Sequence, residues 1–169
     1  MSERFVAVLM GSDSDLPVMQ TTFDVFDRLG IAYEARITSA HRTPDATRAY
    51  VHDAAGRGAA VFVAAAGLAA HLAGAVAAET VRPVIGVPID AGPLNGLDAL
   101  LSTVQMPAGI PVATVAIGRA GARNAAWLAA QILALEEPRV GERLLEERAA
   151  ARDAVAANNE GLAEKLARR

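Results

Sequence analysis

The chain has 169 residues, a formal net charge of −3 and no cysteine. This length predicts one domain over 1–169 that can bury a sizeable core without cross-links. The lack of cysteine excludes disulfides, thiol catalysis and zinc–thiolate sites, and the charge balance offers no basic footprint for nucleic acid. Because the first residues do not resemble a signal peptide, we expect a cytoplasmic location.

Short apolar runs alternate with segments of helical periodicity along the chain. Strands are predicted over 4–10, 32–37, 60–65, 84–87 and 112–117. Helices are predicted over 16–29, 43–55, 69–79, 97–105 and 120–135, and from Pro138 onward. Gly30 and Gly56 are placed to end the first two helices. The alternation predicts a three-layer α/β fold, with a doubly wound, flavodoxin-like parallel sheet of about five strands and helices on both faces.

Two segments allow more than one interpretation. Residues 59–78 are almost continuously apolar and about as long as a membrane span, but glycines and a histidine interrupt them, so we predict a buried strand followed by a buried helix. Residues 138–169 form a charged helical extension with a thin apolar stripe at Leu144, Leu145, Val155, Leu162 and Leu166. This helix is either solvated or packed on a neighbouring subunit. We favour the subunit interface, because a thin stripe on a long helix usually needs a partner.

The loops that follow the strands hold the residues suited to chemistry, because the carboxyl ends of parallel strands share one edge of a sheet. Gly-Ser-Asp-Ser-Asp at 11–15 combines a tight turn with hydroxyls and carboxylates at a helix start. The hydroxyls and carboxylates of this motif are therefore candidate ligands for a phosphate or a sugar diol. Helix capping by Ser14 or Asp13 explains one residue of the motif without any ligand.

The second of these loops, Ser-Ala-His-Arg-Thr-Pro at 39–44, is the most informative segment of the chain. Thr43 is a good N-cap and Pro44 suits the first helical turn, so the motif joins a strand to a helix. Arg42 is suited to binding a phosphate or carboxylate. His41 is the best candidate for proton transfer, since imidazole exchanges protons near neutral pH. A histidine that only bonds the backbone is the alternative.

The third loop, Ala-Ala-Ala-Gly-Leu-Ala-Ala-His-Leu at 64–72, offers small residues that let a ligand approach the backbone. His71 is a candidate for a ligand contact there, although it fits a satisfied core histidine equally well. His52 lies beside Asp53 in a predicted helix, and we expect it at the surface. No His, Asp and Glu cluster has metal-ligand spacing. Acid–base chemistry without a cofactor, on a small phosphorylated ligand, is the interpretation that the residues support.

Several motifs in consistent order resemble the PurE family, the N5-carboxyaminoimidazole ribonucleotide mutases of purine synthesis. They are Gly-Ser-x-Ser-Asp at 11–15, Ser-Ala-His-Arg-Thr-Pro at 39–44, Ala-Ala-His-Leu at 69–72 and Asn-Ala-Ala at 124–126. Gly-x-Asp-x-Leu-Leu-Ser-x-x-Gln-Met-Pro-x-Gly-x-Pro-Val-Ala-Thr at 96–114 is similar to the family as well. The resemblance covers about residues 5–135.

The resemblance implies a homo-octamer without metal or cofactor that acts on a ribonucleotide, with no nucleic acid or membrane partner. The enzyme would move a carboxylate from the exocyclic nitrogen of an aminoimidazole ribonucleotide to ring carbon C4, by releasing CO2 and recapturing it. His41 matches the proton shuttle and Arg42 the phosphate-binding arginine. Ser12 and Asp15 match the substrate-binding serine and the ribose-binding aspartate. The positions matching the rest of the pocket are Ser39, Gly67 and His71.

Some residues depart from the family pattern, which usually has Gly-Ala-Gly-Gly at 65–68 and proline at 73. Here Ala65 and Leu68 replace two glycines and Ala73 replaces the proline. We expect an ordinary backbone at positions 65 and 68, with only the pocket shape changed. A related class with Ser-Ala-His-Lys-Thr in the second motif uses free CO2, so a carboxylase is one alternative to the mutase. A non-catalytic nucleotide-binding module on the same fold is another.

Overall fold

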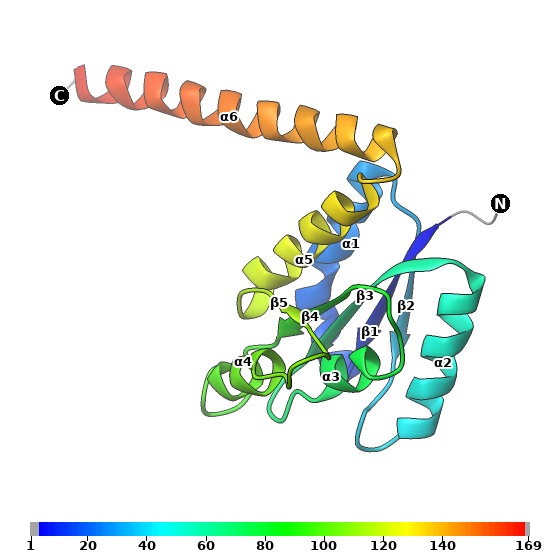
Figure 1. The fold of residues 1–169 in the computed structure, drawn as a ribbon. Helices are drawn as coiled ribbons and strands as arrows, with labels where there is room; N and C mark the ends of the chain where they lie inside the picture. Colours follow the sequence, from blue (N-terminus) through cyan, green and yellow to red (C-terminus); the bar gives the residue numbers. More distant parts are fainter. Residues whose placement is uncertain (1–3, 168–169) are drawn as a thin grey trace.

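A computed structural model describes residues 4–167 of the chain. Its centre is a sheet of five parallel strands, in the order β2-β1-β3-β4-β5 (Figure 1). The strands are β1 (Phe5–Met10), β2 (Tyr33–Ile37), β3 (Ala59–Ala66), β4 (Val84–Pro88) and β5 (Ala113–Thr114). This order is that of the flavodoxin-like sheet, in which the chain changes direction between β1 and β3. The predicted fold class is therefore confirmed.

Helices cover both faces of the sheet, so that it forms the middle of three layers (Figure 1). One face is covered by α1 (Leu16–Leu29) and α5 (Gly118–Leu133), and the other by α2 (Pro44–Arg57), α3 (Leu72–Ala77) and α4 (Leu97–Val104). Successive side chains of a strand point to opposite faces. Thus Val6 and Val8 of β1 pack under α1, whereas Ala7 and Leu9 pack under α2.

Glycines in the left-handed conformation end the first two helices. Gly30 ends α1 with a φ of +61°, as predicted, and the bounds of α1 are those expected from the sequence. The end of α2 was predicted wrongly. Gly56 lies inside α2, and Gly58, with a φ of +112°, ends it. Gly56 and Gly58 flank Arg57, and only Gly58 adopts the left-handed conformation, which glycine tolerates because it has no Cβ.

Other predicted elements are shorter than expected. The strand predicted over 112–117 reduces to Ala113–Thr114, which pairs with Ile85 and Gly86 at the edge of the sheet. The helix predicted over 69–79 begins only at Leu72, because turns occupy the residues before it. Residues 59–78 nevertheless divide into a buried strand and a helix, as predicted. Among residues 4–167 no helix is both long and apolar enough to cross a bilayer.

The last helix, α6 (Pro138–Ala167), begins against the core and then leaves it (Figure 1). Val140 and Leu144 belong to the core cluster under α1 and α5. Further along, large apolar side chains of α6 are more than half exposed: Leu145, Val155, Leu162 and Leu166. Four of the five residues of the predicted stripe are therefore exposed, whereas Leu144 is buried in the chain's own core.

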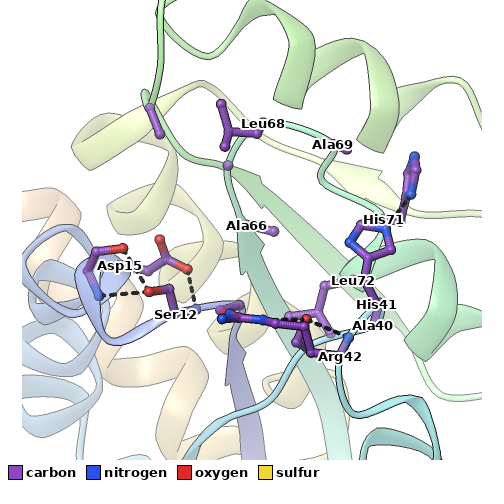
Figure 2. A pocket seen from close by; sticks show the side chains of 15 residues that line it. Ser12, Asp15, Ala40, His41, Arg42, Ala66, Leu68, Ala69, His71 and Leu72 are labelled. Atoms are coloured by element: carbon purple, nitrogen blue, oxygen red, sulfur yellow. Dashed lines mark hydrogen bonds between the residues drawn. The ribbon is translucent and has the colours of Figure 1, made fainter.

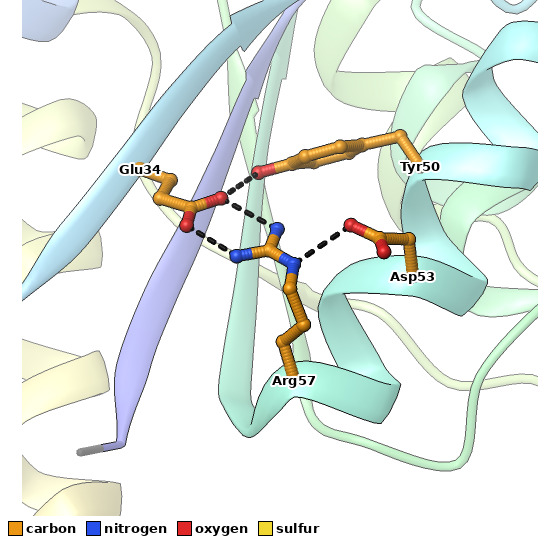
Figure 3. Close-up of polar contacts among 4 residues, drawn as sticks. All are labelled: Glu34, Tyr50, Asp53 and Arg57. Carbon is orange, nitrogen blue, oxygen red and sulfur yellow. Dashed lines mark hydrogen bonds and ion pairs between the residues drawn. The ribbon is translucent and has the colours of Figure 1, made fainter. Parts of the chain in front are cut away.

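Polar contacts tie the edge strand β2 to α2 (Figure 3). Arg57 donates to both carboxylate oxygens of Glu34, at 2.5 and 2.7 Å, and to Asp53 at 2.7 Å. Tyr50 donates to Glu34 at 3.4 Å. Burial and the Glu34 charge raise the pKa of Tyr50 to about 12, and the Arg57 hydrogen bond lowers the pKa of Glu34. His52 lies on the surface of α2, as predicted, and contacts Glu79 at 3.0 Å.

Candidate functional site

A pocket of about 440 Å³ opens at the carboxyl ends of β1 and β3, where the strand order reverses. Ligands bind at this point in open α/β sheets. The loops after β1, β2 and β3 supply most of the wall (Figure 2). Ala91, after β4, completes it. All the candidate site residues line this one pocket: Ser12, Asp15, Ser39, His41, Arg42, Gly67 and His71. Ser14, Ala40 and Ala91 also line the pocket, although the sequence argument did not name them as individual candidates.

The first loop is held by a reciprocal pair of side-chain hydrogen bonds. Ser12 accepts from the backbone N–H of Ser14 at 3.3 Å, and Asp15 accepts from the backbone N–H of Ser12 at 3.1 Å. This arrangement is a capping box, and it begins the short 3₁₀ turn Asp13–Asp15 that leads into α1. Part of this motif does cap the turn, but the capping side chains are Ser12 and Asp15 and not Ser14 or Asp13, the residues considered for this role. The Ser-x-x-Asp spacing was the signal for this box.

Asp15 is the buried carboxylate of the pocket, with 5% of its surface exposed. Burial raises the pKa of Asp15, because a carboxylate loses hydration there, while backbone hydrogen bonds from Ser12 and Gly11 act in the opposite direction. Capping alone does not need a buried charge, since exposed caps serve equally well. The burial of Asp15 beside a hollow is typical of a ligand-binding carboxylate.

Hydrogen bonds within the second loop close it into a rigid turn. The Thr43 hydroxyl accepts from the Ser39 N–H at 3.0 Å and donates to the Ser39 carbonyl at 3.2 Å. Ser39 in turn accepts from the Arg42 backbone N–H at 3.1 Å. Thr43 occupies the N-cap position of α2, but its side chain makes no capping hydrogen bond. Thr43 therefore occupies the predicted N-cap position but does not form the hydrogen bond expected of a cap. Pro44 begins α2 as expected.

The Arg42 side chain lies between the first two loops. Its Nη2 donates to the Gly11 carbonyl at 3.3 Å, and its Nε donates to the Ser39 hydroxyl at 3.5 Å. These bonds use two of the five N–H donors of a guanidinium. The guanidinium therefore keeps donors for an anion in the pocket, in the planar arrangement that suits phosphate or carboxylate oxygens.

The two histidines of the pocket contact each other. His41 Nε2 lies 2.8 Å from His71 Nδ1, and the two rings meet edge to face at a centroid distance of 4.9 Å. In this bond one ring nitrogen donates and the other accepts. His71 stands at the N-cap of α3 rather than inside the helix, and its ring is a pocket residue, not a core histidine. The separation of 30 positions along the chain hides this pairing from any local pattern.

The third loop differs from expectation at one position. Ala65 lies within β3, as predicted, but Leu68 has a φ of +55°. The expectation of an ordinary backbone at Leu68 was wrong. This left-handed conformation costs a residue with a Cβ roughly 1–2 kcal/mol. Gly67 allows a close approach of two loops, since a Cβ on it would lie 2.9 Å from the Cβ of Ala91.

Comparison with known proteins identifies the family of this chain. The model of the AIR carboxylase family matches residues 5–154. N5-carboxyaminoimidazole ribonucleotide mutase from Pseudomonas aeruginosa is 54% identical over 144 residues, covering 85% of this chain and 88% of that protein. The enzyme of the same name from Escherichia coli K12 is 48% identical over 153 residues, covering 90% of both. PurE from Treponema denticola superimposes with a TM-score of 0.84 at 27% identity, over 94% of this chain and 98% of that one. The chain belongs to the AIR carboxylase family.

Proposed function

We propose that this protein is an N5-carboxyaminoimidazole ribonucleotide mutase of purine biosynthesis. It converts its substrate to 4-carboxy-5-aminoimidazole ribonucleotide. The observation that carries the proposal is the meeting of His41, Arg42, Ser12 and Asp15 in one pocket, in a chain about half identical to enzymes of that name. The residues of this pocket fit the three parts of such a substrate, which are a phosphate, a ribose and a carboxylated aminoimidazole.

The polar wall of the pocket would bind the ribose phosphate. The Arg42 guanidinium binds the phosphate through donors that Gly11 and Ser39 do not use. The Asp15 carboxylate accepts from the ribose hydroxyls, and Ser12 adds a further hydroxyl beside it. The Ser39 hydroxyl holds Arg42 in place through its backbone and side-chain contacts.

His41 would move the proton in both halves of the reaction. In the first half, its imidazolium protonates the exocyclic nitrogen as the N–C bond breaks, and the bonding electrons remain on that nitrogen, which leaves an amine and CO2. In the second half, C4 attacks the CO2 carbon, and neutral His41 removes the proton from C4 as the ring is restored. The imidazolium is thus regenerated, so one general acid–base group serves the whole cycle.

His71 and Gly67 would support this chemistry from the third loop. The His71 ring nitrogen, 2.8 Å from His41, holds the orientation of the shuttle and gives its proton a partner. Gly67 keeps the loops after β3 and β4 close together, which narrows the pocket around the reacting carbons. A narrow pocket excludes water from the CO2 that exists between the two halves.

An assay with separately supplied substrates tests the proposal. One arm contains N5-carboxyaminoimidazole ribonucleotide, and the other contains aminoimidazole ribonucleotide with bicarbonate or CO2. We expect fast formation of the C4-carboxylated product in the first arm only, with His41→Asn as the inactive control. Faster turnover in the second arm would identify a carboxylase instead. No product in either arm, with the ribonucleotide still bound, would indicate a non-catalytic binding module.

We further propose that the chain acts as one domain in a homo-octamer within the cytoplasm, and that α6 contacts a neighbouring copy. The exposed apolar residues Leu145, Val155 and Leu162 on a helix that leaves the core support this contact. A deletion from Val140 onward would also remove Val140 and Leu144 from the core. A chain that ends after Arg148 keeps both and should sediment as a smaller assembly than the full chain. An unchanged sedimentation profile would contradict the contact.

A further inference from the structure

Thr43 has a hydroxyl group that serves neither as a helix cap nor as part of the pocket wall. Thr43 occupies the N-cap position of α2, but its side chain makes no capping hydrogen bond. The residues of the second loop that line the pocket are Ser39, Ala40, His41 and Arg42. Thr43 instead borders a separate hollow between the end of β2 and α2. Its hydroxyl therefore has no direct contact with a ligand in the pocket.

The hydrogen bonds of this hydroxyl are directed to Ser39, at the other end of the loop. The Thr43 hydroxyl accepts from the Ser39 N–H at 3.0 Å and donates to the Ser39 carbonyl at 3.2 Å. The backbone N–H of Thr43 also donates to that carbonyl, at 2.9 Å. The hydroxyl of the buried Thr38 lies 3.3 Å from the Thr43 hydroxyl, on the side of the sheet. One side chain thus joins both backbone groups of Ser39 to the start of α2.

The segment closed by these bonds carries the two side chains on which the proposed reaction depends, His41 and Arg42. From this loop the His41 ring contacts His71 of the third loop at 2.8 Å, and Arg42 contacts the Gly11 carbonyl of the first loop at 3.3 Å (Figure 2). Because both side chains leave the same short closed segment, a displacement of that segment moves both of them. A misplacement of about 1 Å is enough to slow a reaction that depends on exact positions.

We infer that Thr43 is a positioning residue, whose hydroxyl holds His41 and Arg42 in their places in the pocket. This inference rests on the proposed mutase function, which gives these two residues the proton transfer and the phosphate contact. Without the hydroxyl, the backbone bond from Thr43 to Ser39 remains, but the Ser39 N–H loses the oxygen that accepts from it. The loop then adopts further arrangements that do not place the imidazole and the guanidinium for reaction.

The test compares Thr43→Val, which replaces the hydroxyl with a methyl group, and Thr43→Ser, which keeps the hydroxyl. In Thr43→Val we expect kcat to fall and KM to rise together, each by roughly fivefold, because the proton shuttle and the phosphate contact are displaced at once. Thr43→Ser should retain both values. Hydrogen exchange of residues 39–43 should be faster in Thr43→Val than in the other two proteins, since the Ser39 N–H has lost its acceptor.

Thr80→Val is the matched control for loss of a threonine hydroxyl. The Thr80 hydroxyl also accepts from a backbone N–H in a loop, that of Arg82 at 3.1 Å, and Thr80 lies outside the pocket wall. Thr80→Val should therefore keep the kcat and the KM of the unaltered protein, and its residues 39–43 should exchange at the unaltered rate.

The possible outcomes separate this inference from the function on which it rests. Unchanged kcat and KM in Thr43→Val would overturn the inference with the mutase function intact, and so would equal losses in Thr43→Ser. A Thr43→Val protein that melts earlier or does not fold, without a kinetic change in the folded protein, would assign the hydroxyl to stability alone and also overturn the inference. Failure of the unaltered protein to form any C4-carboxylated product would instead remove the proposed function. Even then, unchanged hydrogen exchange of residues 39–43 in Thr43→Val would overturn the closure of the loop by Thr43, and faster exchange would support it.

Discussion

Helix α2 has a polar cluster toward each end, and the two clusters are built differently. Toward its carboxyl end, Arg57 contacts both Glu34 and Asp53, so each charged group there has a partner of opposite sign (Figure 3). Before its amino end, His41 and Arg42 face a hollow, and Arg42 uses two donors on protein oxygens. A cluster whose charges satisfy one another stabilises the fold. A cluster that lines a hollow with donors to spare is suited to a ligand.

The largest effect is expected from His41→Asn in the pocket cluster. Loss of the proton shuttle should lower kcat by roughly 100- to 10,000-fold, the usual contribution of general acid–base catalysis. Because the ring is partly exposed at a loop, the melting temperature should change little. Steady-state kinetics and thermal unfolding measure both effects. Turnover within threefold of the unaltered protein would remove His41 from the proposed mechanism.

Arg42→Ala should act mainly on binding. A lost charge-assisted hydrogen bond contributes about 1.5–3 kcal/mol, so KM should rise by roughly 10- to 100-fold. kcat should fall much less, since the phosphate is bound equally in the ground and transition states. The control is Arg48→Ala, because Arg48 lies on α2, the helix that follows Arg42, and pairs with Glu79 away from the pocket. Equal KM values for the two variants would contradict the phosphate contact.

Asp15→Asn is expected to weaken ribonucleotide binding without loss of stability at neutral pH. Burial raises the pKa of Asp15, so ionisation of this group disfavours the folded state. This free-energy cost to folding is absent at pH values below the ordinary pKa of 3.8 and is fully present at pH values above the raised pKa. The free energy of unfolding of the variant, relative to the unaltered protein, should therefore increase from pH 3.5 to pH 7. Asp13→Asn is the control, and a less stable Asp15→Asn at pH 7 would show that the carboxylate's capping role outweighs its burial.

Glu34→Gln in the second cluster should have the smallest effect, on stability and not on turnover. The Arg57 hydrogen bond lowers the pKa of Glu34 below its ordinary value of 4.5. The stabilisation is therefore present above pH 4.5 and is lost as the pH falls through the lowered pKa. At pH 7 the variant should melt at a slightly lower temperature than the unaltered protein, and this difference should disappear as the solution becomes more acidic. Glu160→Gln on the exposed part of α6 is the control. A change in kcat would show that this cluster is coupled to the pocket.

The sequence predicted the three layers and the flavodoxin-like parallel sheet because these depend on local periodicity. It predicted the pocket residues because the carboxyl ends of parallel strands lie at one edge of the sheet. It did not predict what depends on contacts between distant segments. The choice of Gly58 over Gly56, the short β5 and the pairing of His41 with His71 all belong to this group. Leu68 is the clearest case. A leucine in the sequence does not indicate a positive φ, and the contact of its side chain with Gly92 joins two loops that are distant in the sequence.

The capping box of the first loop has a consequence for dynamics. Ser12 and Asp15 begin the turn that leads into α1, and the same two side chains line the pocket. A ribonucleotide that binds them therefore stabilises the start of α1, and fraying of that turn disrupts the binding site. Ligand occupancy and local opening are linked equilibria. Binding of the ribonucleotide should therefore slow hydrogen exchange at the backbone amide of Ser14.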